Sequence, residues 1–144
     1  ALLLGRGTQR AEELAALHGV RLFESLGPTD LRRLHGLAEP RSFAPEGVLC
    51  IEGATGDEVL VLRSGRVSVR VGGFEVNVCG AGDSIGELAA LAPGPRTATV
   101  VATEPCEALA LSGQLFRELL REQPLLAEGV LEQLARRLQG ASHR

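Results

Sequence analysis

Short apolar segments, each bounded by glycine or proline, follow one another through the middle of the chain. They are rich in Val, Ile, Leu and Cys, and they are Arg41–Phe43, Val48–Ile51, Glu58–Arg63, Val67–Val71, Phe74–Cys79, Thr97–Ala102 and Cys106–Ser112. Regular short strands separated by turn residues are typical of a compact antiparallel β-sandwich or roll. The chain has 144 residues, which is enough for one such domain with a core and too few for two.

Two turns indicate which of these segments pair with each other. Gly72-Gly73, between Val71 and Phe74, is the signature of a two-residue β-hairpin. Gly65 marks another tight turn between two apolar segments. Both turns favour antiparallel neighbours that are adjacent in sequence.

The chain before the strands has a helical pattern. Residues 10–18 combine helix-forming residues with apolar positions three residues apart. A second helix is expected over residues 30–38, because Thr29 or Asp30 can accept hydrogen bonds from its first free amides. Helices therefore precede the strands.

After the last apolar segment, the apolar residues are again spaced as on one face of a helix. Ser112 can cap a helix over Gly113–Glu122. Pro124 suits the first turn of a final helix, which is expected to run to about Gln139 and to end at Gly140. The predicted order is therefore helices, a β-roll, and a pair of C-terminal helices.

The segment before residue 100 carries the most informative arrangement of polar residues. Gly86 permits unusual backbone torsion angles, and Glu87–Leu91 can form one short helical turn. A loop turned by Pro93-Gly94-Pro95 then presents Arg96, whose guanidinium suits phosphate oxygens. A carboxylate beside such a site is explained if the ligand also offers a hydroxyl. The alternative is that Glu87 and Arg96 form an ordinary structural ion pair.

The sequence Gly86-Glu87-Leu88-Ala89, followed by Pro95-Arg96-Thr97-Ala98-Thr99-Val100, resembles the phosphate-binding cassette of the cyclic-nucleotide-binding domain family. The resemblance extends over nearly the whole chain. It implies an α+β, mainly β fold: an eight-stranded antiparallel β-roll (a jelly roll) with N-terminal helices and a C-terminal helix pair. Residues 1–40 would be the N-terminal helical segment, 41–112 the roll with its cassette at 82–100, and 113–140 the helices that close and signal. Together they would form one domain.

The resemblance also implies roles for individual cassette residues. Glu87 would accept the ribose 2′-hydroxyl of a cyclic nucleotide, and Arg96 would pair with its cyclic phosphate. Gly86 would allow the close approach of the backbone, and the amides of Leu88 and Ala89, with Thr97, would complete the phosphate site.

Four further residues are expected at the base. Val69 and Cys79 would line its pocket, although both also suit the core of the roll. Ile85 stands where the family often has Phe, so the wall is aliphatic. The chain has no Trp or Tyr, and an arginine of the last helix is therefore a candidate lid. The resemblance favours Arg137 over Arg136; a solvated arginine face is the alternative.

Composition excludes several other classes of function. Cys50, Cys79 and Cys106 show no zinc-ligand spacing, and the histidines are scattered, so neither a metal site nor a catalytic centre is expected. The net charge is −3, without a basic patch, so direct nucleic-acid binding is not expected. Nothing is long and apolar enough to span a membrane. Unpaired cysteines suggest a reducing compartment, either the cytoplasm or the cytosolic domain of a membrane protein.

The sequence thus predicts a non-enzymatic sensor that binds cAMP or cGMP, requires no cofactor, and acts on an attached effector such as a channel, transporter or kinase. The Arg- and Ala-rich, lysine-free composition suggests a bacterial source. We therefore expect cAMP to be preferred, because it is the commoner messenger in bacteria. The chain does not begin with Met, and we interpret it as a piece of a longer protein. The alternatives are a scaffold of the same fold that binds nothing, the sensor half of a transcription regulator, and an enzyme such as a phosphodiesterase.

Overall fold

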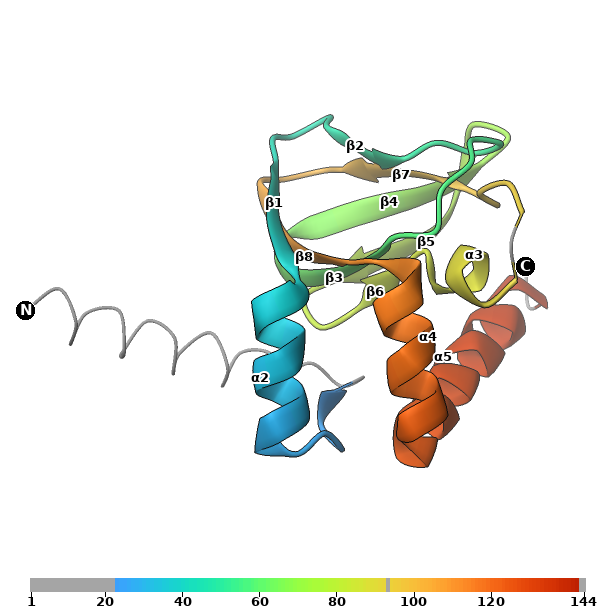
Figure 1. Cartoon of the computed structure of the whole chain (residues 1–144). Coiled ribbons are helices and arrows are strands. Elements are labelled where there is room, and N and C mark those ends of the chain that lie inside the picture. Colours follow the sequence, from blue (N-terminus) through green and yellow to red (C-terminus); the bar gives the residue numbers. More distant parts are fainter. Residues whose placement is uncertain (1–22, 93, 143–144) are drawn as a thin grey trace, which may run out of the picture.

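A computed structural model describes residues 23–92 and 94–142 of the chain (Figure 1). Within that part, the strands form two four-stranded antiparallel sheets. The first sheet has the order β1-β8-β3-β6, with β1 at Glu39–Phe43, β8 at Cys106–Leu111, β3 at Val59–Ser64 and β6 at Ser84–Ile85. The second has the order β2-β7-β4-β5, with β2 at Val48–Cys50, β7 at Thr99–Ala102, β4 at Arg66–Val71 and β5 at Phe74–Gly80. The predicted eight-stranded antiparallel roll is confirmed.

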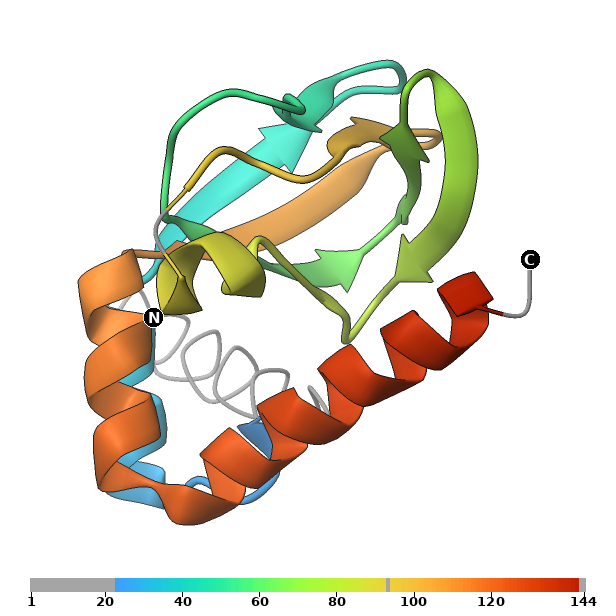
Figure 2. The same ribbon diagram turned by 90° about the vertical axis from the view of Figure 1, so that its right-hand side faces the viewer.

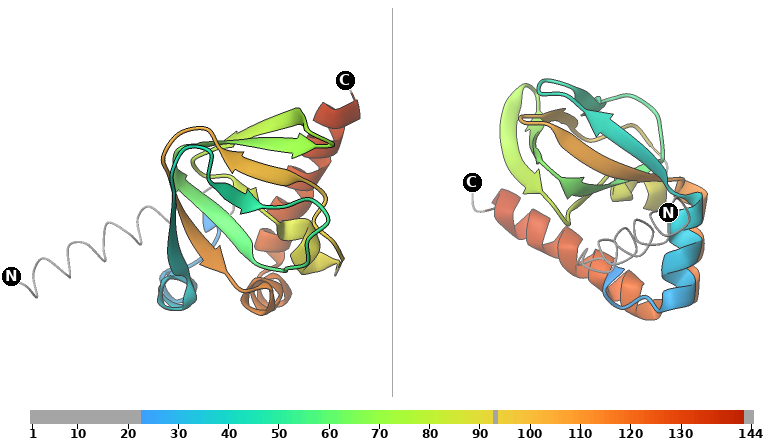
Figure 3. Two further views of the ribbon diagram at one scale, coloured as in Figure 1. Left: turned by 90° about the horizontal axis from the view of Figure 1, so that it is seen from above. Right: turned by 90° about the vertical axis from the view of Figure 1, so that its left-hand side faces the viewer.

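The first sheet lies between the second sheet and the helices, which explains why its two central strands are apolar on both faces (Figure 3). In β3, Leu60 and Leu62 point into the core between the sheets, whereas Val59 and Val61 pack against the helices. Alternate residues of a strand point to opposite faces, so a strand covered on both sides becomes a continuous apolar run. The first sheet therefore packs against the second sheet on one face and against the helices on the other.

Three longer helices cover that sheet: α2 at Pro28–Leu37, α4 at Gly113–Glu122 and α5 at Pro124–Ser142. Figure 3 shows α2 and α4 side by side, and Arg33 of α2 forms ion pairs with Glu118 and Glu122 of α4 at 3.0 and 2.7 Å. The α5 helix leaves α4 at a sharp angle and runs along the roll past β6 (Figure 2). Its buried Leu126 and Val130 belong to the helical core.

The turns and one helix cap follow the sequence prediction. Gly72 and Gly73 have φ angles of 60° and 84° and close the β4–β5 hairpin, in which Val71 pairs with Phe74. The Ser112 hydroxyl oxygen accepts a hydrogen bond from the Leu115 amide at 3.1 Å and caps α4. Both features were predicted from the residues alone.

Two predicted helix ends are wrong, and one short strand was not predicted. The cap of α2 is Gly27, with Pro28 in the first turn, so Thr29 and Asp30 lie inside the helix rather than before it. Proline suits that position, because its missing amide would have no partner there. The last helix continues through Gly140 to Ser142.

The third difference is β6, which was not predicted as a strand. It has only Ser84 and Ile85, too few residues to show a period in the sequence. The helix expected over residues 10–18 lies outside the described residues, as does Pro93.

Candidate functional site

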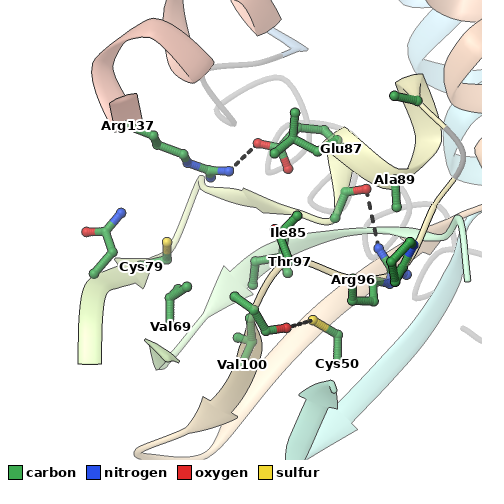
Figure 4. Close-up of a pocket in the computed structure, with 16 residues that line it drawn as sticks. Cys50, Val69, Cys79, Ile85, Glu87, Ala89, Arg96, Thr97, Val100 and Arg137 are labelled. Carbon is green, nitrogen blue, oxygen red and sulfur yellow. Dashed lines mark hydrogen bonds and ion pairs between the residues drawn. The ribbon is translucent and has the colours of Figure 1, made fainter. Parts of the chain in front are cut away.

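A cavity of about 290 Å³ opens between the second sheet, the segment Gly86–Thr97 and α5 (Figure 4). It is bordered by all ten residues that the sequence singled out for a ligand: Val69, Cys79, Ile85, Gly86, Glu87, Leu88, Ala89, Arg96, Thr97 and Arg137. The volume is at the lower end of the range typical of small-molecule sites. Residues from β4, β5, the cassette and the last helix thus meet around one hollow.

Gly86 begins the cassette helix α3, Glu87–Leu91, in a conformation that favours glycine. Its φ is 91°, in the left-handed region. A Cβ atom at this position would lie 2.3 Å from Arg96 Nη1 and 2.7 Å from the Glu58 carbonyl oxygen. Neither the torsion angle nor the space allows a side chain, so the backbone of α3 and the guanidinium can approach closely.

Arg96 is held by the chain on both its backbone and its side chain. Its amide donates to the Ala54 carbonyl, and its own carbonyl accepts from the Gly53 amide, both at 2.8 Å. The guanidinium donates from Nη2 to the Glu58 carbonyl at 3.0 Å and from Nη1 to that of Gly86 at 3.4 Å. These contacts use only part of its five donors and aim it at the start of α3.

Arg96 and Glu87 do not form the ion pair that was the ordinary alternative. Among the described residues, Arg96 donates to main-chain carbonyls, whereas Glu87 pairs with Arg137. The amides in the first turn of α3, including those of Leu88 and Ala89, have no intrahelical acceptor. The positive groups at this end of the cavity are therefore not neutralised by the cassette carboxylate.

Glu87 is a carboxylate buried in the wall of the cavity, with an exposed fraction of 1%. Its Oε1 accepts a hydrogen bond from Arg137 Nη1, while Oε2 is buried and has no partner in the described part of the chain. Burial raises the pKa of the Glu87 carboxyl above its ordinary value, and the charge of Arg137 opposes that rise. An unpaired buried acceptor costs free energy and suits a ligand that can donate a hydrogen bond.

Arg137 comes from α5 and borders the cavity on the side opposite Arg96 (Figure 4). Besides Glu87, its Nη2 contacts the Ser84 carbonyl. The buried Ser84 hydroxyl donates to Gln133 Oε1, one helical turn earlier on α5, at 2.9 Å. Arg136 is exposed and does not border the cavity.

The rest of the cavity wall is mostly apolar. Val69, Cys79 and Ile85 line this part of the cavity, and burial raises the pKa of the Cys79 thiol, which favours its neutral form. Six residues were missed by the sequence reasoning: Cys50, Asn77, Ala92, Pro95, Ala98 and Val100. Asn77 could have been found, because it lies two residues before Cys79 and therefore faces the same side of β5.

Two further observations concern other kinds of site. Over residues 23–92 and 94–142, no three His, Cys, Asp or Glu side chains gather in a way that could hold a metal ion. Among the helices described there, none is both long and apolar enough to cross a bilayer.

Comparison with known proteins places this geometry in a family. The family model described as the cyclic nucleotide-binding domain matches residues 40–123, more than half of the chain. The Pycsar effector protein PaPycTIR of Pseudomonas aeruginosa is 39% identical over 78% of this chain and 37% of its own length. A cyclic nucleotide-gated potassium channel of Rhizobium etli is 33% identical over 77% of this chain and 31% of its own.

A solved structure agrees with these matches. The catabolite activator protein of Thermus thermophilus is 31% identical, with a TM-score of 0.72 over 85% of this chain and 60% of that one. The chain spans between 11% and 58% of the length of the curated relatives compared. The match to the family model, carried by the roll and by the cassette around Gly86 and Arg96, shows that this chain belongs to the cyclic nucleotide-binding domain family.

Proposed function

We propose that the cavity binds a cyclic nucleotide, with cAMP preferred to cGMP, and that the domain reports this binding to an effector elsewhere in a longer protein. One observation carries the proposal. A buried carboxylate with an unpaired oxygen and a half-buried guanidinium border the same, otherwise apolar cavity. A cyclic nucleotide combines a hydroxyl donor, an anionic phosphate and an apolar base, and so matches all three parts.

At the phosphate end, Arg96 supplies the positive charge. Its contacts with Glu58 and Gly86 orient the guanidinium before any ligand arrives, which lowers the entropy lost on binding. The first amides of α3, from Leu88 and Ala89, and the exposed Thr97 complete the set of donors. Charge-assisted bonds of this kind are the strong ones in phosphate recognition.

At the sugar and base end, Glu87 Oε2 accepts a hydrogen bond from the ribose 2′-hydroxyl. Val69, Cys79 and Ile85 provide an aliphatic surface for the purine. This surface fits adenine and guanine alike. The preference for cAMP therefore rests on the bacterial character of the composition.

We propose that the domain holds its ligand without changing it and acts by a population shift, because the conformation that closes over the nucleotide is the one the nucleotide stabilises. The effector and a cytosolic location belong to this proposal. Similar proteins carry the names of an effector, a gated channel and kinase regulatory subunits, so one domain of this kind serves several effectors. A non-binding scaffold and the sensor half of a transcription regulator are the alternatives.

Calorimetric titration of the chain with cAMP, cGMP and 5′-AMP tests the proposal. We expect one site per chain with a Kd for cAMP of about 10 µM or tighter, which corresponds to roughly −7 kcal/mol. 5′-AMP carries the same base and sugar with an open phosphate, and should bind much more weakly. No heat and no thermal stabilisation with either cyclic nucleotide would favour the scaffold.

A further inference from the structure

Asn77 of β5 brings a polar side chain to a cavity wall that is otherwise mostly apolar. Its Oδ1 accepts a hydrogen bond from the amide of Val78 at 2.9 Å. Only the oxygen of a side-chain amide can accept from a main-chain amide, so this contact also fixes which end of the group carries the donors. Within the described part of the chain, Nδ2 has no acceptor. The two hydrogens on Nδ2 are therefore available to a ligand.

The register of the second sheet places Asn77 far from Arg96. One row of paired residues crosses the sheet from β2 to β5, and all of its members border the cavity: Cys50, Val100, Val69 and Asn77. Three strand spacings separate the ends of this row, which makes its length roughly 14 Å. Figure 4 shows Cys50 on the side of Arg96 and Val69 away from it. A nucleotide whose phosphate lies at Arg96 therefore extends its base toward Asn77.

We propose that Asn77 is a specificity-determining residue of this cavity, and that its Nδ2 donates a hydrogen bond to a ring nitrogen of the purine. The inference rests on the proposed function, since it concerns the base of the same ligand. Ring nitrogens of a purine that carry no hydrogen are acceptors and match a free donor. With Oδ1 engaged by Val78, a donor is what Asn77 has left to offer.

The apolar surroundings explain why this donor would discriminate between bases. Asn77 is half-buried, and its neighbours Val69, Cys79 and Ile85 offer at best the weak acceptor of a thiol. A base that covers this wall excludes water from Nδ2, and a donor left without an acceptor there costs free energy. A ring nitrogen at the facing edge of the base satisfies the donor, whereas a C–H group at the same place does not.

A purely structural role for Asn77 is the alternative. β5 lies at the edge of its sheet, and the contact with Val78 satisfies a main-chain amide of that strand. Such a role uses Oδ1 alone and would affect all ligands alike. Two variants separate the roles, because Asn77→Asp keeps an oxygen for the Val78 amide but lacks the donor, whereas Asn77→Ala lacks both.

The test is a double cycle of variant and base. Calorimetry measures the affinities of wild type, Asn77→Ala, Asn77→Asp and Val78→Ala for cAMP and for its 1-deaza, 3-deaza and 7-deaza analogues, each of which replaces one ring nitrogen by C–H. In wild type, one analogue should bind about 3- to 10-fold more weakly than cAMP. In both Asn77 variants, that difference should fall below about 2-fold. Val78 is the control, because its half-exposed side chain lies on the opposite face of β5, and Val78→Ala should keep the full difference.

Three results would overturn the inference. Wild type could bind cAMP and all three analogues equally well, the weaker analogue could remain as weak relative to cAMP in both Asn77 variants, or Val78→Ala could lose the difference to the same extent. Wild type that binds neither cAMP nor any analogue would instead refute the proposed function, and this inference with it. A contact at N1 has a further consequence, because N1 of guanine carries a hydrogen. If the 1-deaza analogue is the weak one, the preference for cAMP over cGMP should also fall in Asn77→Ala, and an unchanged preference would contradict the contact.

Discussion

The cassette and α5 contribute to the same cavity in different ways. The cassette residues lie within one short stretch of sequence, and Gly86 and Arg96 are fixed by backbone geometry and by carbonyls of the Ala54–Glu58 segment. Arg137 lies some forty residues later on α5, which packs in the helical core through Leu126 and Val130 and contacts β6 at Ser84 and α3 at Glu87. The comparison indicates that the groups proposed to bind the ligand lie in one stretch of sequence, whereas the group from the last helix is brought to the cavity by tertiary packing.

Removing the positive charge of Arg96 should have the largest effect on the affinity for cAMP. Arg96→Ala leaves the phosphate anion without its cation, and we expect the affinity for cAMP to fall by about 2–4 kcal/mol. Calorimetry of the folded variant measures this, with the exposed Arg121→Ala as a charge-matched control. If Arg96→Ala bound cAMP as the wild type does, the cassette would not be the phosphate site.

The backbone of the cassette is tested by adding one methyl group. Gly82 and Gly86 both have φ near 91°, but a Cβ meets nothing within 4 Å at Gly82 and clashes with Arg96 and the Glu58 carbonyl at Gly86. Gly82→Ala should therefore cost only the torsional penalty, about 1 kcal/mol of unfolding free energy, and Gly86→Ala about 2–3 kcal/mol. Denaturant titrations compare the two, and equal losses would show that the close approach at Gly86 does not matter.

Glu87→Gln should affect binding and stability in opposite directions. The proposed ribose contact weakens when its acceptor becomes neutral, so the cAMP affinity should fall by about 5- to 10-fold, less than for Arg96→Ala. Because burial raises the pKa of Glu87 in the folded chain, ionisation of this group costs stability as the pH rises through the folded pKa. The nucleotide-free variant should therefore gain stability relative to the wild type near neutral pH.

That stability advantage should shrink as the pH falls through the ordinary pKa range of glutamate. Below that range the Glu87 carboxyl is protonated in both the folded and the unfolded state. Denaturation of both proteins across this pH range checks the sign. An advantage that grows toward low pH would mean that Glu87 is ionised more readily in the folded chain than in the unfolded one.

Thr97→Ala should have the smallest effect. The exposed hydroxyl can serve the phosphate or reach the 2-amino group of guanine, and either contact is worth about 1 kcal/mol. Competition of cAMP and cGMP against one fluorescent analogue, in wild type and variant, separates these roles. A preference for cGMP of tenfold or more that disappears in Thr97→Ala would reverse the expected order of ligands.

The difference between the two regions also decides what the sequence could predict. Gly86, Glu87 and Arg96 could be singled out because they belong to one short motif that resembles a known cassette, and the structure brings all three to one cavity. The pairing of Arg137 with Glu87 could not be found, because it depends on how α5 crosses β6. Asn77 was missed although the alternation of β5 indicates its direction, whereas Cys50 reaches the cavity through its pairing with Val100 on β7, which no local pattern reveals.

The fold was more predictable than its boundaries. Glycine turns and alternating apolar segments specify antiparallel strands through short-range chemistry, as the hairpin at Gly72-Gly73 illustrates. The start of α2 was misplaced because Thr29 and Asp30 are good caps in isolation, and Pro28 was not recognised as the first helical residue. The two-residue β6 exists only through its pairing with β3.

Hydrogen–deuterium exchange with and without saturating cAMP tests the central claim most directly, because it reports on the cassette and α5 in one experiment. We predict slower exchange at the amides of Gly86–Ala89 and, through Glu87 and Arg137, in α5 around Gln133, with neither change in Arg96→Ala. Protection confined to a surface away from the cavity, or none in either region, would contradict the assignment of this cavity as a cyclic nucleotide site.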